Sequence, residues 1–146
     1  MNAAMDGGDD PFERLKNLPP RGHHAMLGIH NVADGADWVE LAIPFNPDFF
    51  IDAERELVSS GPIVSLIDAA AGAAIIARTR QWRPMATLDL RVDYLRGAKA
   101  GRALHARATC YHLTSKVAFT RCDVHDGDPA DPIAFATASF FFTADP

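Results

Sequence analysis

One apolar stretch, residues 59–77, constrains the fold more than any other part of the sequence. It opens with two serines and a glycine, which are residue types that cap helices, and Pro62 suits the first helical position because its missing N–H would be unpaired there. The remainder is rich in Ala, Leu and Ile, and Gly72 is its one weak helix former. We expect a helix that is apolar on nearly every side and therefore buried over most of its circumference.

Asp68 is the only charged residue of this stretch. A carboxylate in an apolar helix is costly to bury unless something uses it there. We therefore expect a functional role for Asp68, against the alternative of a structural carboxylate that accepts hydrogen bonds from a neighbouring loop. Because Asp68 also interrupts the only long apolar run, we expect no membrane span.

Length and composition are those of a single globular domain: 146 residues, 48% hydrophobic and 23% charged. Residues 1–10 are small and acidic and lack the basic-then-apolar order of a signal peptide. Cys110 and Cys122 form neither a metal-binding spacing nor a disulfide framework. A reducing cytoplasm is the expected location.

Charge is unevenly distributed along the chain. Residues 78–121 contain ten of the fourteen Lys and Arg residues and only two of the nineteen acidic residues, a local balance of +8 in a chain of net charge −5. This segregation indicates an anionic ligand near one part of the fold. Nucleic acid is not expected, because the cations alternate along apparent strands without an aromatic stacking platform or a recognition helix.

The order of the elements predicts an α+β fold. A short helix over residues 9–15 belongs to an N-terminal segment, residues 1–24, which precedes the main domain of residues 25–146. In that domain the patterns predict strands over residues 26–32, 38–45, 86–94, 104–111, 117–125 and 133–143, with an irregular connection over residues 46–58 before the helix. We expect the strand 86–94 to lie centrally in the sheet, with its inner face formed by Ala86, Leu88, Leu90, Val92 and Tyr94. A helix that is apolar all round requires a curved sheet wrapped around it.

Three segments resemble the hotdog-fold acyl-CoA thioesterases of the phenylacetyl-CoA thioesterase type. They are Ser-Gly-Pro-Ile-Val-Ser-Leu-Ile-Asp-Ala-Ala-Ala-Gly at residues 60–72, Thr-Leu-Asp-Leu-Arg-Val-Asp-Tyr-Leu-Arg at residues 87–96, and Ala-Phe-Ala-Thr-Ala-Ser-Phe at residues 134–140. The resemblance covers residues 27–142. It implies a single-domain hotdog fold, a homodimer or dimer of dimers with sites between subunits, and hydrolysis of an acyl- or aryl-CoA to the free acid and coenzyme A without a cofactor.

The chain departs from the family pattern at two positions. Better-known members open the helix with His-Gly-Gly and carry an Asp or Glu nine residues after that His. Here the triplet is Ser59-Ser60-Gly61 and the carboxylate is Asp68, at the matching separation. Some similar relatives also carry Ser-Gly-Pro at this point, so the missing His is compatible with activity. Several members place a hydroxyl residue four positions after the carboxylate, where this chain has Gly72.

The resemblance implies that residues at the start of the helix and in its middle have different catalytic roles. The backbone N–H groups of Ser60 and Gly61, which we expect to be free at the positive end of the helix dipole, would hold the oxyanion of the attacked thioester. Asp68 would activate water as a general base or attack the carbonyl directly, and the sequence leaves both routes open. Asn46 would orient the water or the carbonyl.

Further residues are expected to contact the substrate, although each also has an ordinary structural explanation. Ser59, Phe49, Phe50 and Trp82 lie beside the predicted helix ends, where an acyl pocket would form. Arg96, Lys99 and Arg102 flank one turn and would bind the phosphates of coenzyme A. Lys116 lies in the next turn but one and would join them, from the partner subunit if necessary. Helix capping, core packing and a solvated sheet face are the alternatives.

Histidine spacing does not predict a metal site. His23 and His24 are adjacent in an apparent loop, and His105, His112 and His125 are spread over predicted strands without ligand spacing. Two other functions stay open. The missing His and Gly72 favour a non-catalytic acyl-CoA-binding module. A hotdog dehydratase or hydratase would need a His upstream of the helix, and no His lies between His30 and His105.

Overall fold

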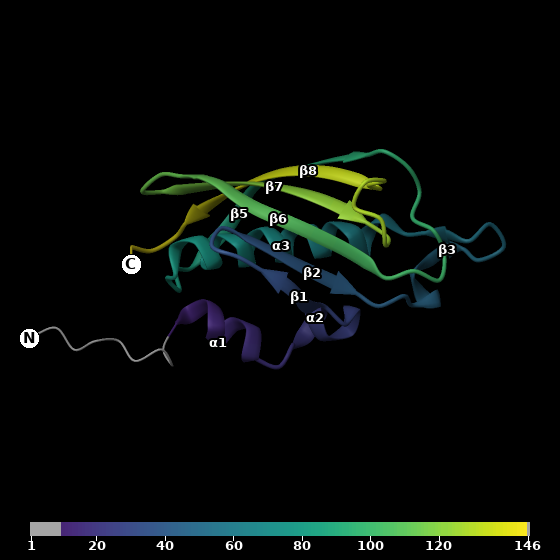
Figure 1. The fold of residues 1–146 in the computed structure, drawn as a ribbon, viewed down its shortest axis with the longest axis horizontal. Coiled ribbons are helices and arrows are strands. Elements are labelled where there is room, and N and C mark those ends of the chain that lie inside the picture. The colour runs from purple at the N-terminus through teal and green to yellow at the C-terminus, as the bar shows by residue number, and fades with distance from the viewer. Residues whose placement is uncertain (1–9, 146) are drawn as a thin grey trace, which may run out of the picture.

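A long helix, α3 (Ser60–Thr79), packs against one face of a six-stranded antiparallel sheet (Figure 1). The computed structural model describes residues 10–145. Across the sheet the order is β1-β2-β6-β7-β8-β5. The strands are β1 (His30–Asp34), β2 (Trp38–Ile43), β5 (Met85–Tyr94), β6 (Leu104–Leu113), β7 (Val117–His125) and β8 (Ala134–Phe142). The α+β architecture expected from the sequence is confirmed.

The helix α3 supplies the centre of the core. Its N-cap is Ser59, whose Oγ accepts a hydrogen bond from the Gly61 N–H, so Pro62 is the third helical residue rather than the first. The buried residues of α3 are Pro62, Ile63, Leu66, Ile67, Ala70, Ala71, Ala73, Ala74, Ile75, Ile76 and Ala77. By length and composition α3 could cross a membrane, as a core helix of this kind often could, and more than half of it is buried inside the protein.

One stripe of α3 is left partly uncovered by the chain's own sheet. Its members recur at the spacing of one helix face: Val64, Ser65, Asp68, Ala69 and Gly72. The helix is thus buried over most, but not all, of its circumference, as its sequence predicts. The only charged residue among its first eighteen lies on the open stripe.

The N-terminal elements differ from expectation at one boundary. The helix α1 (Pro11–Asn17) is capped by the Asp10 side chain, as predicted. The predicted strand 26–32 is wrong in its first half, because residues 26 and 27 end a second helix, α2 (Gly22–Leu27). Gly28 ends α2 in the left-handed conformation, with φ of 71°, and this C-cap forces the strand to begin later. The acidic stretch over residues 1–9, in which no signal peptide was expected, lies outside the described residues.

The connection between β2 and α3 is more ordered than predicted. It contains a short 3-10 helix, η1 (Pro47–Phe49), and a small hairpin of β3 (Phe50–Asp52) with β4 (Leu57–Val58). The Ser59 N–H donates to the Phe49 carbonyl at 2.7 Å. This contact fixes the hairpin against the start of α3.

The strand β5 lies at the edge of the sheet, so its predicted central position is wrong. Among the described strands it pairs with β8 alone, and a β-bulge interrupts that pairing between Thr87 and Asp89. The bulge adds one residue and reverses the alternation. Thr87 therefore faces α3, whereas Leu88, expected inside, is 59% exposed. Beyond the bulge Leu90 and Val92 pack against the core as expected.

A buried ion pair joins two loops at one end of the sheet. The Asp126 side chain is 1% exposed and accepts hydrogen bonds from the Arg96 guanidinium at 2.7 and 3.1 Å and from the Lys99 N–H at 2.7 Å. The Arg96 guanidinium also contacts Asp131. Hydrogen bonding to Arg96 lowers the pKa of Asp126 from 3.8 to about 2. The loop after β5 is thereby held against the loop after β7.

This pair predicts a specific dependence of stability on pH. Because the pKa of Asp126 is lower in the folded protein, its stabilisation is complete above the ordinary value of 3.8 and is lost as the pH falls toward about 2. Asp126→Asn should lower the melting temperature at pH 7 and remove this component of the acid transition, measured by thermal unfolding across a pH series. Asp145→Asn is the matched control, since Asp145 pairs with Lys116 on the surface and should leave the melting temperature unchanged. Equal melting temperatures for Asp126→Asn and wild type would show that the pair is not stabilising.

Candidate functional site

Asp68 lies on the open stripe of α3, half-buried and directed at β5. The Thr87 hydroxyl donates a hydrogen bond to its Oδ1 at 2.7 Å. A short O–H···O⁻ contact of this kind is charge-assisted and fixes the orientation of the carboxylate. Within the described residues Thr87 is the only side chain that hydrogen bonds to Asp68, so the second carboxylate oxygen remains available to a ligand.

Thr87, the hydrogen-bond donor to Asp68, is the site residue that the sequence did not predict. Strict alternation placed it on the wet face of its strand, and the bulge at Leu88 turns it toward the helix instead. A single-residue bulge leaves no clear pattern in the sequence. The Thr-Leu-Asp segment resembles the family's strand, but the hydroxyl role of Thr87 follows only from the structure.

A groove of about 760 Å³ runs beside Asp68. One wall is formed by α3, from Asp68 through Gly72 to Ile76, together with Met85 of β5. The opposite wall is formed by α1, the Pro19-Pro20 segment, α2 and β1. A Cβ atom built on Gly72 would meet nothing within 4 Å. The groove is mostly apolar and has a carboxylate at its edge, which suits a ligand that is an apolar chain attached to a reactive polar group.

The helix α2 brings histidine close to this stripe. His23 Nε2 lies 2.8 Å from the Ser65 Oγ, one helical turn before Asp68, and His24 lines the groove. Both residues lie in a helix against α3 and not in the loop that their sequence predicts. The position at which the family carries histidine is occupied by the capping residue Ser59.

At the start of α3 one expected donor is already occupied. The Gly61 N–H donates to Ser59 Oγ at 3.3 Å, so the expectation that both the Ser60 and Gly61 N–H groups are free is wrong for Gly61. Ser60 is exposed and occupies the first helical position, where the N–H has no acceptor within the helix. Asp68 lies eight residues further on, about 12 Å along the axis at 1.5 Å per residue.

A second group of predicted residues gathers near the same end of α3. Asn46, Phe49, Lys99 and Arg102 line one small recess beneath the loop that follows β5. The Asn46 side chain caps η1 by accepting from the Asp48 N–H at 2.9 Å. Phe50 contacts Phe45 edge to face, with ring centroids 5.7 Å apart. None of these residues lines the groove beside Asp68.

The remaining predicted contacts are not brought together within one chain. Arg96 is committed to Asp126 and Asp131, so its assignment as a ligand-binding cation is not supported by the geometry. Trp82 is 61% exposed beyond the C-terminal end of α3, and Lys116 pairs with Asp145 at that same end of the sheet. The 20 residues of α3 span about 30 Å, which separates both from Lys99 and Arg102.

Most cations of the basic stretch have partners inside the protein. Arg78, Arg80, Arg83 and Arg91 bond to carbonyls or carboxylates, and Arg107 lies over the Trp38 ring. Within residues 10–145, Arg102 and Arg121 are the cations of this stretch for which no such partner is found, and only Arg102 lies in the recess. Of the ten cations in this stretch, Arg102 is therefore the one best placed to bind an external anion, and Lys99 lies beside it.

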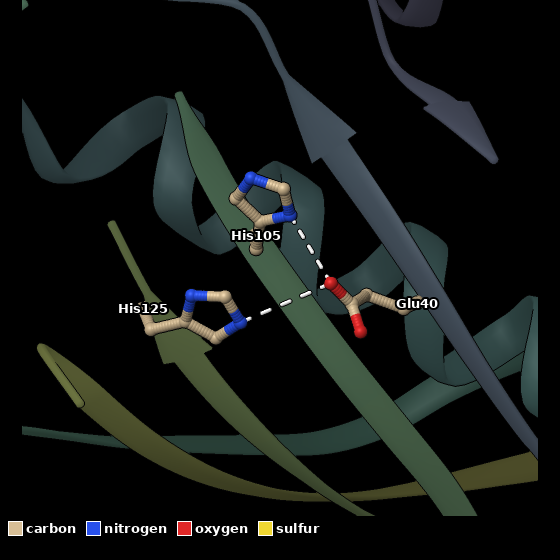
Figure 2. A group of neighbouring side chains, drawn as sticks. All are labelled: Glu40, His105 and His125. Atoms are coloured by element: carbon tan, nitrogen blue, oxygen red, sulfur yellow. Dashed lines mark hydrogen bonds and ion pairs between the residues drawn. The ribbon is translucent and has the colours of Figure 1, made fainter. Parts of the chain in front are cut away.

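The predicted scatter of the histidines is wrong for two of them. His105 and His125 are cross-strand neighbours on β6 and β7, and both reach Glu40 of β2 (Figure 2). This polar cluster lies on the face of the sheet away from α3, so it is separate from the groove beside Asp68.

The chain matches a known protein family in sequence and several solved structures in fold. The sequence model of the thioesterase superfamily matches residues 57–133, more than half of the chain. The medium/long-chain acyl-CoA thioesterase YigI of Salmonella typhimurium is 29% identical over 116 residues, which are 70% of this chain and 74% of that protein. A solved structure from Pseudomonas aeruginosa is 28% identical and has a TM-score of 0.74 over 91% of this chain and 95% of that one. The PaaI protein from the phenylacetic acid degradation operon of Escherichia coli shares the fold, with a TM-score of 0.78 and 15% identity over 93% of this chain and 92% of that one.

Proposed function

Because this chain belongs to the thioesterase superfamily, we propose that it hydrolyses the thioester bond of an acyl-CoA at a site built around Asp68. The matched residues 57–133 contain Asp68, Thr87 and the start of α3. The hotdog fold and the thioester hydrolase class expected from the sequence are confirmed by this family match and by the architecture. Acyl-CoA as the substrate is supported by the relatives that carry that activity in their names.

The observation that carries the proposal is the carboxylate held by Thr87 at the edge of an apolar groove. As a general base, Asp68 would take a proton from water while the water oxygen attacks the thioester carbonyl. As a nucleophile, the free carboxylate oxygen would attack that carbon itself. In both routes the carbon–sulfur bond breaks and coenzyme A leaves as a thiolate that then takes up a proton. In the second route the acyl group is left on Asp68 as a mixed anhydride, which water then hydrolyses to the free acid and the carboxylate. The Thr87 hydroxyl keeps the reacting oxygen in a fixed direction.

One chain does not place the oxyanion donors beside its own Asp68. A base, a water and a carbonyl carbon in contact span about 6 Å, and donors must lie about 3 Å from the developing oxyanion. The Ser60 N–H lies about 12 Å from Asp68 along the helix, which is too far for both to act on one carbonyl. We infer that the donor comes from the α3 N-terminus of a second copy.

The edge strand β5 offers the surface for that copy. No described strand pairs with its outer edge, and Leu88 and Tyr94 of this strand are exposed. Antiparallel pairing of β5 with the β5 of a second chain creates a two-fold axis and sets the two α3 helices antiparallel on one face of the joined sheet. The start of one α3 then approaches the open stripe of the other. A dimer of dimers would repeat this unit.

The same arrangement brings together predicted site residues that lie at opposite ends of α3 within one chain. Arg102 and Lys99 lie near the start of α3, and we assign them to the coenzyme A phosphates. Trp82 and Lys116 lie at the other end of α3, which in an antiparallel dimer approaches the partner's start. Cys110 and Cys122 are buried free thiols, in keeping with a cytoplasmic location.

Gly72 indicates where the acyl chain lies. Glycine in a helix interior costs about 1 kcal/mol relative to alanine, and no neighbour here excludes a Cβ atom. Its missing side chain widens the groove one turn beyond Asp68. We assign the groove to an aliphatic acyl chain of medium or greater length, as the name of the YigI relative also suggests.

The alternative of a non-catalytic acyl-CoA-binding module rests on the absence of the family histidine at residue 59. It shares the groove and the recess with the proposed function but needs no carboxylate. The two functions therefore differ in what Asp68 contributes.

The first test replaces Asp68. Asp68→Asn keeps the shape and the acceptor for Thr87 but removes the base, so thiol release from acyl-CoA should fall by at least about 100-fold. The matched control is Asp123→Asn on β7, an exposed carboxylate away from β5 and the groove, which should retain wild-type turnover. Full turnover by a folded Asp68→Asn protein would disprove the assignment, and a wild type that binds acyl-CoA without releasing thiol would establish the binding module.

The second test removes one backbone donor. Ser59 has φ −62° and ψ 144°, which suits a residue that precedes proline, and proline is favoured at the first helical position. Ser60→Pro should therefore fold normally yet lower kcat by about 100- to 1000-fold, because the N–H is lost. Ser60→Ala keeps the N–H and should remain close to wild type. A large loss in Ser60→Ala would instead assign the role to the hydroxyl.

Mixing these variants tests whether the site is shared. When Asp68→Asn and Ser60→Pro proteins are unfolded together and refolded at equal concentration, about half of the dimers combine one chain of each kind. A site shared between chains leaves one of the two sites in each mixed dimer intact, so activity should recover to about a quarter of wild type. If each chain uses its own donor and base, no activity returns.

The third test narrows the groove. Gly72→Leu should lower kcat/KM for long acyl chains by about 10-fold or more while changing acetyl-CoA hydrolysis little, because only the long chain reaches residue 72. Gly72→Ala is the control and should give a smaller effect with a more stable helix. A uniform loss across all chain lengths would place the acyl chain elsewhere.

A further inference from the structure

Three strands contribute one polar side chain each to a cluster on the face of the sheet away from α3. His105 of β6 pairs directly with His125 of β7, and Ala42 of β2 pairs with His105, which places Glu40 diagonally beside it. The sequence neighbours Leu41, Ala106 and Val124 point the other way and are buried in the core. The position of the cluster is thus fixed by the register of three central strands.

Both imidazole rings direct a nitrogen at the same carboxylate oxygen, as Figure 2 shows. The Glu40 Oε1 lies 3.1 Å from His105 Nδ1 and 3.8 Å from His125 Nε2. The ring planes are within 5° of parallel and the centroids are 4.9 Å apart. One donor atom from each residue lies within 4.8 Å of the other two.

The Glu40–His105 distance already suits one metal ion, whereas the wider distances must shorten and the stacked rings must rotate so that both nitrogens point at the ion. Around a tetrahedral zinc ion with bonds of 2.0–2.1 Å, donor atoms lie about 3.3 Å apart. Two imidazoles and a carboxylate form a common donor set for divalent transition metals. The side chains of Glu40 and His125 are 15% and 9% exposed, so the site is largely shielded yet reachable.

We propose that Glu40, His105 and His125 bind one divalent transition-metal ion of the zinc type, with solvent at the fourth position. The site lies on the opposite face of the sheet from Asp68 and has no part in thioester hydrolysis. Its effect is structural, because an ion held by β2, β6 and β7 stabilises the folded protein over the unfolded chain.

One contact shows what must change on binding. The Gly127 N–H donates to His125 Nδ1 at 3.2 Å, so the proton of neutral His125 lies on Nε2, facing Glu40. When a metal occupies Nε2, that proton moves to Nδ1 and the Gly127 contact breaks. The Gly127 amide is therefore a local reporter of metal at this site.

The test uses the full-length protein without an affinity tag and Zn²⁺ as the probe. Calorimetric titration should show one ion bound per chain, a melting temperature raised by several degrees, and a shift of the Gly127 amide resonance. His105→Gln and Glu40→Gln should each weaken binding by at least about 10-fold. His112→Gln is the matched control, since His112 lies on the same strand but packs against Phe119 outside the cluster.

Two results would overturn the proposal. One is the absence of binding by the wild type at up to about 100 µM Zn²⁺. The other is binding that His105→Gln and Glu40→Gln leave unchanged with the Gly127 resonance unmoved, which would assign the ion to His23, His24 or His30. Should either variant fail to fold, the Gly127 shift in the wild type decides between these outcomes. Thioesterase activity is not a readout, so this result is independent of the proposed function.

Discussion

The rest of the structure depends on the burial of α3. A helix of twenty residues with so few polar side chains is unstable in water unless other elements cover it. The sheet packs against one side of α3, and the stripe that carries Ser65, Asp68 and Gly72 is only partly buried. What the sheet leaves open is covered in part by α1 and α2 across the groove. The place where burial is incomplete is therefore also the place where a ligand and a second chain would fit.

Features that depend on nearby residues could be predicted from the sequence. The extent of α3, the capping role of Ser59, the choice of Asp68 and the alternation of the later strands all follow from local patterns. The family resemblance added the hotdog fold and the thioesterase class, which the family match confirms. The assignment of the catalytic carboxylate to Asp68 stays a prediction.

Features that depend on distant pairing could not be predicted. The edge position of β5 follows from the order of strands, which alternation does not encode. The bulge that turns Thr87 inward inserts one extra residue into the strand, and no feature of the sequence marks its position. Arg96 looked available because its partner Asp126 lies 30 residues away in sequence. His105 and His125 looked unrelated until the register of β6 and β7 brought them together.

Three features that lower the stability of a single chain lie close together in this fold. Gly72 lowers helix propensity where alanine would fit, Asp68 places a charge on the central helix, and β5 leaves one backbone edge unpaired within residues 10–145. Each carries a free-energy cost, and nothing in the packing of a single chain requires any of them. Natural sequences concentrate such violations where function needs them. The thioesterase site that we propose, shared between two chains, would account for all three, since it needs the carboxylate, the space beside it and the edge that brings the second helix near.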